Sequence, residues 1–169
     1  ASTCLALGKD SLALAWATRA WQIWSGTPEM SHVEDKLICL NVLGGVYLTR
    51  YKFRRNANDL ELARQYFRQG MALARTFSFQ KAEYEDLAAT VKWIIQLAEN
   101  GIQAELRAFE QSGDPQAPAN AWEYAEQTKA ILLHNVLLES RAARFAGLPD
   151  STAQELIRAK HQMLWLEKR

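Results

Sequence analysis

Cys39 and His32 have the side-chain types of a nucleophile and its base, and they lie seven residues apart. On a helix this spacing places both on one face, but about 10 Å of helical rise separates them. A catalytic pair must approach to about 3 Å, so these two do not form a dyad. The apolar neighbours Ile38 and Leu40 indicate that Cys39 is a buried packing residue. We therefore expect no catalytic residue and no enzyme activity in this chain.

Metal and cofactor chemistry has no better candidates in the sequence. The three histidines, His32, His134 and His161, are far apart, and no His-x-x-x-His or Cys-x-x-Cys motif occurs. Gly44-Gly45 lacks the following Lys and Ser or Thr of a phosphate-binding loop. The acidic pair Glu34-Asp35 falls near a predicted helix start, where it complements the helix dipole. We expect neither metal ligands nor a cofactor.

The basic run Arg50-Tyr51-Lys52-Phe53-Arg54-Arg55 combines positive charge with aromatic rings, as surfaces that bind single-stranded nucleic acids do. Its position near a helix C-terminus offers a simpler explanation, because cations there stabilise the helix dipole. The whole chain carries 20 Lys and Arg against 19 Asp and Glu. Binders of nucleic acid and of membrane surfaces need a large basic excess. We therefore expect no nucleic-acid partner and no membrane partner.

Helices must position all of these side chains. Helical periodicity runs through the 169 residues, and no stretch alternates apolar and polar residues as a strand does. Ser31 with Glu34, and Ser151 with Gln154, match the spacing of a capping box. One helix through Gly101 is favoured over two that break there, because the apolar phase continues across it. The predicted helices span 10–24, 31–53, 59–75 (capped by Asp59), 81–111 and 120–145, with a sixth from 151 to the end.

One spacing of small residues recurs on alternate predicted helices. It places a small residue, then Ala or an aromatic ring, then a small residue at positions i, i+4 and i+7 of one helical face. Small residues let the backbone of a neighbouring helix approach closely. The three copies are Ala13, Ala17 and Ala20; Ala63, Phe67 and Gly70; and Ala121, Ala125 and Thr128. The spacing predicts an inner seam along each of these helices.

The best copy also has a matching first helix, with Leu43, Gly44 and Tyr47 preceding the motif that begins at Ala63. This order of residues resembles the tetratricopeptide repeat. The other two copies, which begin at Ala13 and Ala121, lie farther from Ala63 than one regular repeat of about 34 residues. The resemblance therefore implies degenerate repeats. It implies an all-α fold, a right-handed α-α superhelix of about six helices.

The segment 120–169 resembles the stretch that joins such repeats to a caspase-like peptidase domain in bacterial CHAT proteins. The matching sequences are AWEYAEQTKA at 121–130 and ESRAARFAGLPDS at 139–151. The resemblance divides the chain into degenerate repeats over 1–112 and a last repeat helix with a linker helix over 113–169. It also implies that the His and Cys of the peptidase lie in a further domain, beyond this segment.

In a superhelix of paired helices, the first helix of each pair lines the concave side, where a peptide or partner helix binds. An amide such as that of Asn41 can bond a peptide backbone as donor and as acceptor. By helical phase from Leu43 and Tyr47, the residues expected on the concave side are Ile38, Asn41, Gly45, Leu48 and Thr49. We expect a non-catalytic interaction or scaffold module of a larger CHAT-like protease or signalling protein, with a protein or peptide partner.

Two other interpretations stay open. The chain is alternatively a compact helical bundle that binds a small ligand or acts as a stand-alone enzyme, or a module that self-associates through exposed repeat ends. Neither a secretory signal nor an apolar segment long enough to span a membrane is visible, which predicts a cytoplasmic protein. The sequence begins without Met and ends in a helical pattern, so we expect the native N-terminus to be missing.

Overall fold

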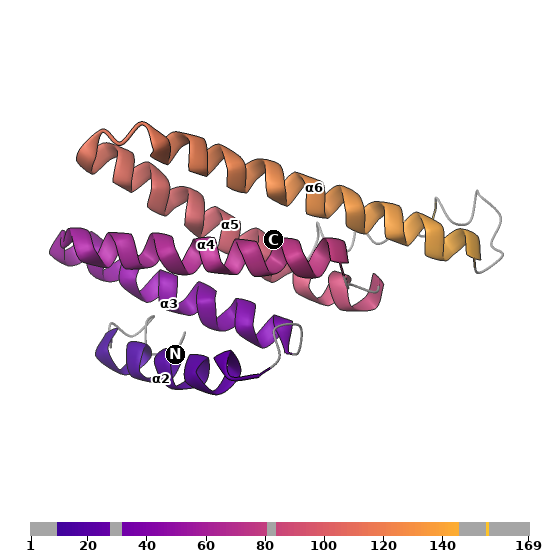
Figure 1. The fold of residues 1–169 in the computed structure, drawn as a ribbon, viewed down its shortest axis with the longest axis horizontal. Helices are drawn as coiled ribbons and strands as arrows, with labels where there is room; N and C mark the ends of the chain where they lie inside the picture. Colours follow the sequence, from indigo (N-terminus) through magenta and orange to yellow (C-terminus); the bar gives the residue numbers. More distant parts are fainter. Residues whose placement is uncertain (1–9, 28–31, 81–83, 146–154, 156–169) are drawn as a thin grey trace.

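Five α-helices make up the part of the chain that the computed structural model describes, which is residues 10–27, 32–80, 84–145 and 155 (Figure 1). No strand occurs within these ranges, so the predicted all-α fold class is confirmed there. The sixth predicted helix, with its capping box at Ser151, lies outside the described residues. The helices are α2 (Asp10–Ser25), α3 (Val33–Arg54), α4 (Ala57–Gln80), α5 (Tyr84–Ser112) and α6 (Gln116–Phe145).

The helices pack side by side in the order of the sequence. Each helix contacts the next one along the chain, α3 also contacts α5, and α4 also contacts α6. Figure 1 shows α2 and α6 at opposite edges of this array, with α5 behind α4. Helix-on-helix packing of this kind buries one stripe of every amphipathic helix. Each helix from α3 to α6 therefore contacts a helix two positions away in the sequence as well as its immediate neighbour.

α3 begins at Val33, two residues later than the sequence predicted. His32 occupies the cap position with a left-handed backbone (φ 53°) and makes no capping hydrogen bond with its side chain. The other predicted member of the capping box, Ser31, lies outside the described residues. The Glu34 carboxylate accepts a hydrogen bond of 2.8 Å from Trp93 Nε1 on α5. Glu34 therefore joins two helices that are far apart in the sequence.

α4 begins at Ala57, two residues earlier than predicted, because Asn56 and not Asp59 caps it. The Asn56 side-chain oxygen accepts from the backbone N–H of Asn58 at 3.0 Å, as a helix cap does. Asp59 lies inside the first turn, where it is buried and 3.5 Å from Arg50 Nη2 on α3. The carboxylate predicted as a cap thus forms part of the contact between α3 and α4.

α5 is one continuous helix through Gly101, which confirms the favoured prediction and excludes a break at that glycine. The helix ends before Gly113, whose left-handed backbone (φ 66°) suits a residue without a Cβ. The Gly113 N–H donates to the carbonyl of Phe109 at 2.8 Å, so one of the last free carbonyls is satisfied. The left-handed backbone of Gly113 therefore ends α5 and begins the turn to α6.

α6 begins at Gln116, four residues earlier than predicted. Asp114 Oδ1 accepts from the backbone N–H of Gln116 at 3.0 Å and starts the helix. Pro118 lies in the first turn, where backbone N–H groups have no partner within the helix. Pro118, which lacks a backbone N–H, therefore costs no hydrogen bond at this position.

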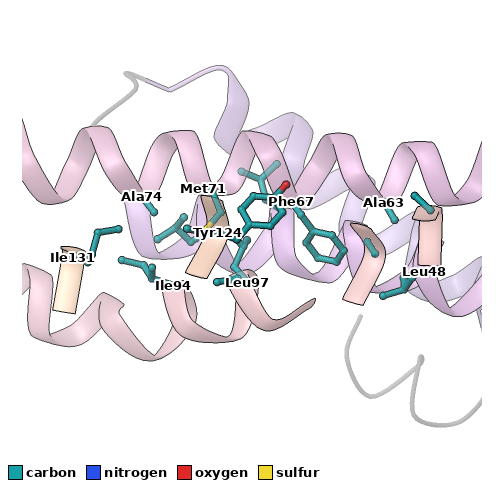
Figure 2. Close-up of a cluster of buried hydrophobic side chains, with 14 of the residues drawn as sticks. Leu48, Ala63, Phe67, Met71, Ala74, Ile94, Leu97, Tyr124 and Ile131 are labelled. Carbon is teal, nitrogen blue, oxygen red and sulfur yellow. The ribbon is translucent and has the colours of Figure 1, made fainter. Parts of the chain in front are cut away.

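The core is one cluster of apolar side chains from α3, α4, α5 and α6. Figure 2 shows side chains from these helices pointing into a shared interior. Phe67 of α4 is fully buried at the centre, and Leu97 and Ile131 are buried from the other side. α2 packs on α3, and its Ala13 and Ala17 are buried. The labelled core residues are Leu48, Ala63, Phe67, Met71, Ala74, Ile94, Leu97, Tyr124 and Ile131.

Candidate functional site

Glycines mark the closest contacts between consecutive helices. A methyl group at Gly44 of α3 would lie 2.5 Å from Cε1 of Phe67 on α4. One at Gly70 of α4 would lie 2.5 Å from Cδ1 of Leu97 on α5. One at Gly101 of α5 would lie 2.9 Å from Cε2 of Tyr124 on α6. At each glycine the neighbouring side chain leaves no room for a Cβ. The α3–α4, α4–α5 and α5–α6 contacts therefore each depend on a residue without a side chain.

The α3–α4 pair recurs along the chain as the α5–α6 pair. In both pairs a ring of the second helix packs on a glycine of the first, Phe67 on Gly44 and Tyr124 on Gly101, at the same sequence separation. Buried positions match in the same register, such as Leu40 with Leu97 and Ala74 with Ile131. The structure therefore aligns Tyr124 with Phe67.

The third copy of the small-residue motif, which begins at Ala121, does not follow this register. It would align Ala125 with Phe67, and that position is one residue later than Tyr124. Ala125 and Thr128 are only half-buried, whereas Tyr124 is buried. The seam of α6 with α5 therefore passes through Tyr124.

The structure separates the five residues predicted for the concave surface into two groups. Ile38, Gly45 and Thr49 are partly exposed on α3. Leu48 is buried in the core cluster. Asn41 is also buried, and its amide oxygen accepts a hydrogen bond of 2.8 Å from Asn100 Nδ2 on α5. Asn41 therefore joins α3 to α5.

The partly exposed residues of α3 belong to a stripe that has an equivalent on α5. On α3 the stripe residues lie at positions i, i+4, i+7 and i+11, which share one helical face. The α5 stripe consists of the residues that align with them when Gly101 is aligned with Gly44. A methyl group at Gly45 would meet no atom within 4 Å, so the middle of this surface is open. The stripe residues are Ile38, Val42, Gly45 and Thr49 on α3, and Ile95, Glu99, Ile102 and Leu106 on α5.

We name these eight residues the α3–α5 surface. It is mainly apolar, and its most exposed apolar side chain is Leu106, which is 46% exposed. Glu99 is the one charged residue of the set, and it is exposed. An apolar strip of this kind is typical of a surface that binds apolar side chains of another molecule.

A buried carboxylate joins α4, α5 and α6 behind that surface. Glu105 of α5 is 0% exposed and lies 2.7 Å from Arg64 Nη2 and 3.4 Å from Arg68 Nη2, both on α4. Asn120 of α6 donates to the same carboxylate at 3.3 Å. Burial and the nearby Glu105 charge raise the pKa of Tyr124. These contacts pair the buried carboxylate with two guanidinium groups and an amide, and they hold three helices together.

A cavity of about 230 Å³ lies beside this cluster, between α4 and α6. Arg68, Arg75 and Glu123 line it together with Tyr124 and Gln127. The Tyr124 hydroxyl and the Gln127 side-chain oxygen are buried and have no hydrogen-bond partner among the described residues. Two arginines and one glutamate line this cavity, and Arg68 is already paired with Glu105.

The remaining chemistry-bearing residues are dispersed. Cys39 is buried, and its pKa is raised by burial and by the neighbouring Asp35 carboxylate. His32 Nδ1 lies 3.7 Å from Asp35 at the surface. Among the described residues, no group of three or more His, Cys, Asp or Glu side chains could hold a metal ion.

No helix in the described ranges is both long and apolar enough to cross a bilayer. No protein-family model matches the chain, and neither does any curated protein or solved structure. The interpretation of the α3–α5 surface therefore depends on its own geometry.

Proposed function

We propose that this chain is a non-catalytic interaction module, a tetratricopeptide-like α-α superhelix that binds a peptide or protein segment on the α3–α5 surface. The observation that carries the proposal is the repetition of one helix pair, with a ring on a glycine at the same place in each copy. Stacked repeats present equivalent residues of successive first helices on one continuous face. Partners of such proteins bind to that face.

The chemistry of the surface defines the partner segment. Ile38, Ile95 and Leu106 offer apolar contacts, and the open space at Gly45 accommodates an apolar side chain of the partner. Exposed Glu99 favours a partner with a basic residue opposite it. We infer a segment with spaced apolar side chains and one Lys or Arg.

The resemblance of 120–169 to CHAT proteins supports a wider setting for this module. In that setting the module is the part of a larger cytoplasmic CHAT-like protease or signalling protein that recognises or assembles with a partner.

A peptide-display selection tests the proposal. A random peptide library is selected against the purified chain, and the affinity of each selected peptide is measured by fluorescence anisotropy. Gly45→Arg adds a large cationic side chain in the middle of the α3–α5 surface, and its Cβ would meet no atom within 4 Å. We expect it to weaken binding by about tenfold or more, which corresponds to about 1.4 kcal/mol of lost binding free energy.

The matched control is Leu133→Glu, a charged substitution at a 61% exposed leucine of α6 outside the α3–α5 surface. It should leave the affinities unchanged, and circular dichroism should show that both variants fold. Selected peptides that are enriched in apolar and basic residues support the proposal. Peptides that bind Gly45→Arg as tightly as the unaltered chain contradict it, and so does a selection that yields no specific peptide.

A further inference from the structure

A second cavity, which is open to solvent and larger than the one between α4 and α6, lies away from the α3–α5 surface. It has a volume of about 540 Å³ and lies between α2 and the last turns of α3. Volumes of about 300–1,000 Å³ are typical of sites that hold small ligands. Two of its lining residues, Arg50 and Arg54, come from the basic run that the sequence analysis considered for nucleic-acid binding.

The charged side chains that line the cavity all have the same sign. Arg19 of α2 and Arg50 and Arg54 of α3 line it, and none of its lining residues is acidic. Neither Arg19 nor Arg54 forms an ion pair with a described residue. The hydroxyls of Ser11 and Thr18 line the same wall of α2. The cavity is therefore lined with hydrogen-bond donors and guanidinium groups, which bind oxyanions in a bidentate geometry.

Arg50 is held in place by its neighbours on the side away from solvent. Its Nη2 lies 3.5 Å from Asp59 Oδ1 of α4, and its guanidinium lies 5.5 Å from the centre of the Tyr47 ring. Its Nε is buried and has no hydrogen-bond partner among the described residues. Arg50 is thus positioned to bind without having to be ordered by the ligand.

The net charge selects the class of anion. The three guanidinium groups carry a charge of +3, and the Asp59 carboxylate paired with Arg50 carries −1, so the net charge is +2. A phosphate monoester carries about −1.5 to −2 at neutral pH, whereas a carboxylate or a nucleic-acid phosphodiester carries one negative charge. We propose that the cavity formed by Arg19, Arg50 and Arg54 binds a phosphate monoester group, carried by a small molecule or by a phosphorylated peptide side chain.

Isothermal titration calorimetry at low salt with the full chain tests this assignment. Inorganic phosphate and a phosphoserine peptide are the probes, with the unphosphorylated peptide as reference. We expect saturable binding of a phosphate probe with a Kd of about 1 mM or tighter. The double variant Arg19→Gln/Arg54→Gln keeps the contact of Arg50 with Asp59, and it should weaken binding by about tenfold or more. Arg107→Gln, which changes a surface arginine on α5 outside the cavity, should not alter the affinity.

The two probes distinguish the source of the phosphate. Tighter binding of the phosphoserine peptide than of inorganic phosphate assigns a phosphorylated segment, and equal or weaker binding assigns a small phosphate compound. Circular dichroism establishes that the double variant folds. The proposal is overturned if neither probe binds, if the unphosphorylated peptide binds equally well, or if the double variant and Arg107→Gln bind alike. Stronger binding of a single-stranded DNA oligomer than of either probe overturns it as well.

Discussion

Gly44 and Gly45 are neighbours in the middle of α3, yet the same substitution should affect them in opposite directions. A methyl group at Gly44 would lie 2.5–2.8 Å from three ring atoms of Phe67. Phe67 is 0% exposed, so its ring has no solvent-filled space into which to move. A methyl group at Gly45 would meet no atom within 4 Å. Comparing Gly44→Ala with Gly45→Ala therefore separates the free-energy cost of the clash with Phe67 from the general effect of replacing a helical glycine.

The magnitudes follow from two opposing effects. Alanine stabilises a helix interior by about 1 kcal/mol relative to glycine, and this gain applies equally at both positions. Overpacking a well-packed core costs about 1–3 kcal/mol, and it applies only at Gly44. We therefore expect Gly45→Ala to raise the free energy of unfolding by up to about 1 kcal/mol. Gly44→Ala should lower it by up to about 2 kcal/mol, so that the two variants differ by about 1–3 kcal/mol.

Urea unfolding followed by far-UV circular dichroism measures both free energies under one set of conditions. In thermal unfolding, each kcal/mol should appear as about 2–4 °C in Tm for a chain of this length. Adding Phe67→Leu to Gly44→Ala should recover part of the loss, because residues in contact couple by about 0.5–3 kcal/mol in a double-mutant cycle.

Equal changes in both single variants would refute the close approach of α3 and α4 at Gly44. A double-mutant cycle with no coupling between Gly44 and Phe67 would refute it independently. Either result would also remove the repeated glycine–ring contact on which the alignment of the two helix pairs depends.

Three further predictions concern the buried polar groups. Arg64→Ala leaves the Glu105 carboxylate buried without its nearest partner and should cost about 3–5 kcal/mol in urea unfolding. Arg68→Ala, at a 44% exposed side chain, should cost less than about 1 kcal/mol. The raised pKa of Tyr124 means that the native protein keeps this proton when the unfolded chain, with a pKa of about 10, loses it. Stability should therefore fall as the pH rises above about 10, and this contribution should be absent from Tyr124→Phe; an identical alkaline profile would contradict the burial of the hydroxyl. The raised pKa and burial of Cys39 should make its reaction with a thiol reagent at neutral pH much slower than that of a free cysteine, with rapid labelling appearing only in urea. Fast labelling of Cys39 in the native chain, measured by mass spectrometry of its peptide, would contradict this placement.

The sequence was sufficient to predict the fold class and the existence of each described helix. Apolar periodicity is a local property, and it extended correctly through Gly101. The errors lie at helix boundaries: α4 and α6 begin earlier than predicted, α3 begins later, and α4 continues to Gln80 where the prediction ended at residue 75. Asn56 caps α4 because Asp59 is engaged by Arg50 on a different helix, and no pattern within the segment reveals that tertiary contact.

The candidate surface was predicted less completely than the helices. Of the residues that helical phase predicted for the concave side, Ile38, Gly45 and Thr49 are partly exposed. Leu48 is buried in the core, and Asn41 is held by Asn100 of α5. The equivalent residues of α5 were not predicted, because the phase was worked out from Leu43 and Tyr47 for one helix only. The glycine spacing contained the missing signal, since the interval from Gly44 to Gly101 equals the interval from Phe67 to Tyr124.

Glu105 was not recognisable from the sequence, because a glutamate in an amphipathic helix ordinarily faces water. The repeat register supplies a clue in retrospect, because the equivalent position in α3 is the buried Leu48. An arginine pair from α4 replaces the apolar contacts that a leucine would make there. Such a substitution is visible only after the two helix pairs have been aligned.

The position of Glu105 affects the order in which the helices unfold. Arrays of helical pairs tend to open from their ends, one unit at a time, because each unit contacts only its neighbours. Here the carboxylate of Glu105 on α5 is fixed by two guanidinium groups of α4 and by the Asn120 amide of α6. Amide hydrogens of α4, α5 and α6 should then exchange with deuterium together, in one concerted opening, while those of α2 exchange earlier.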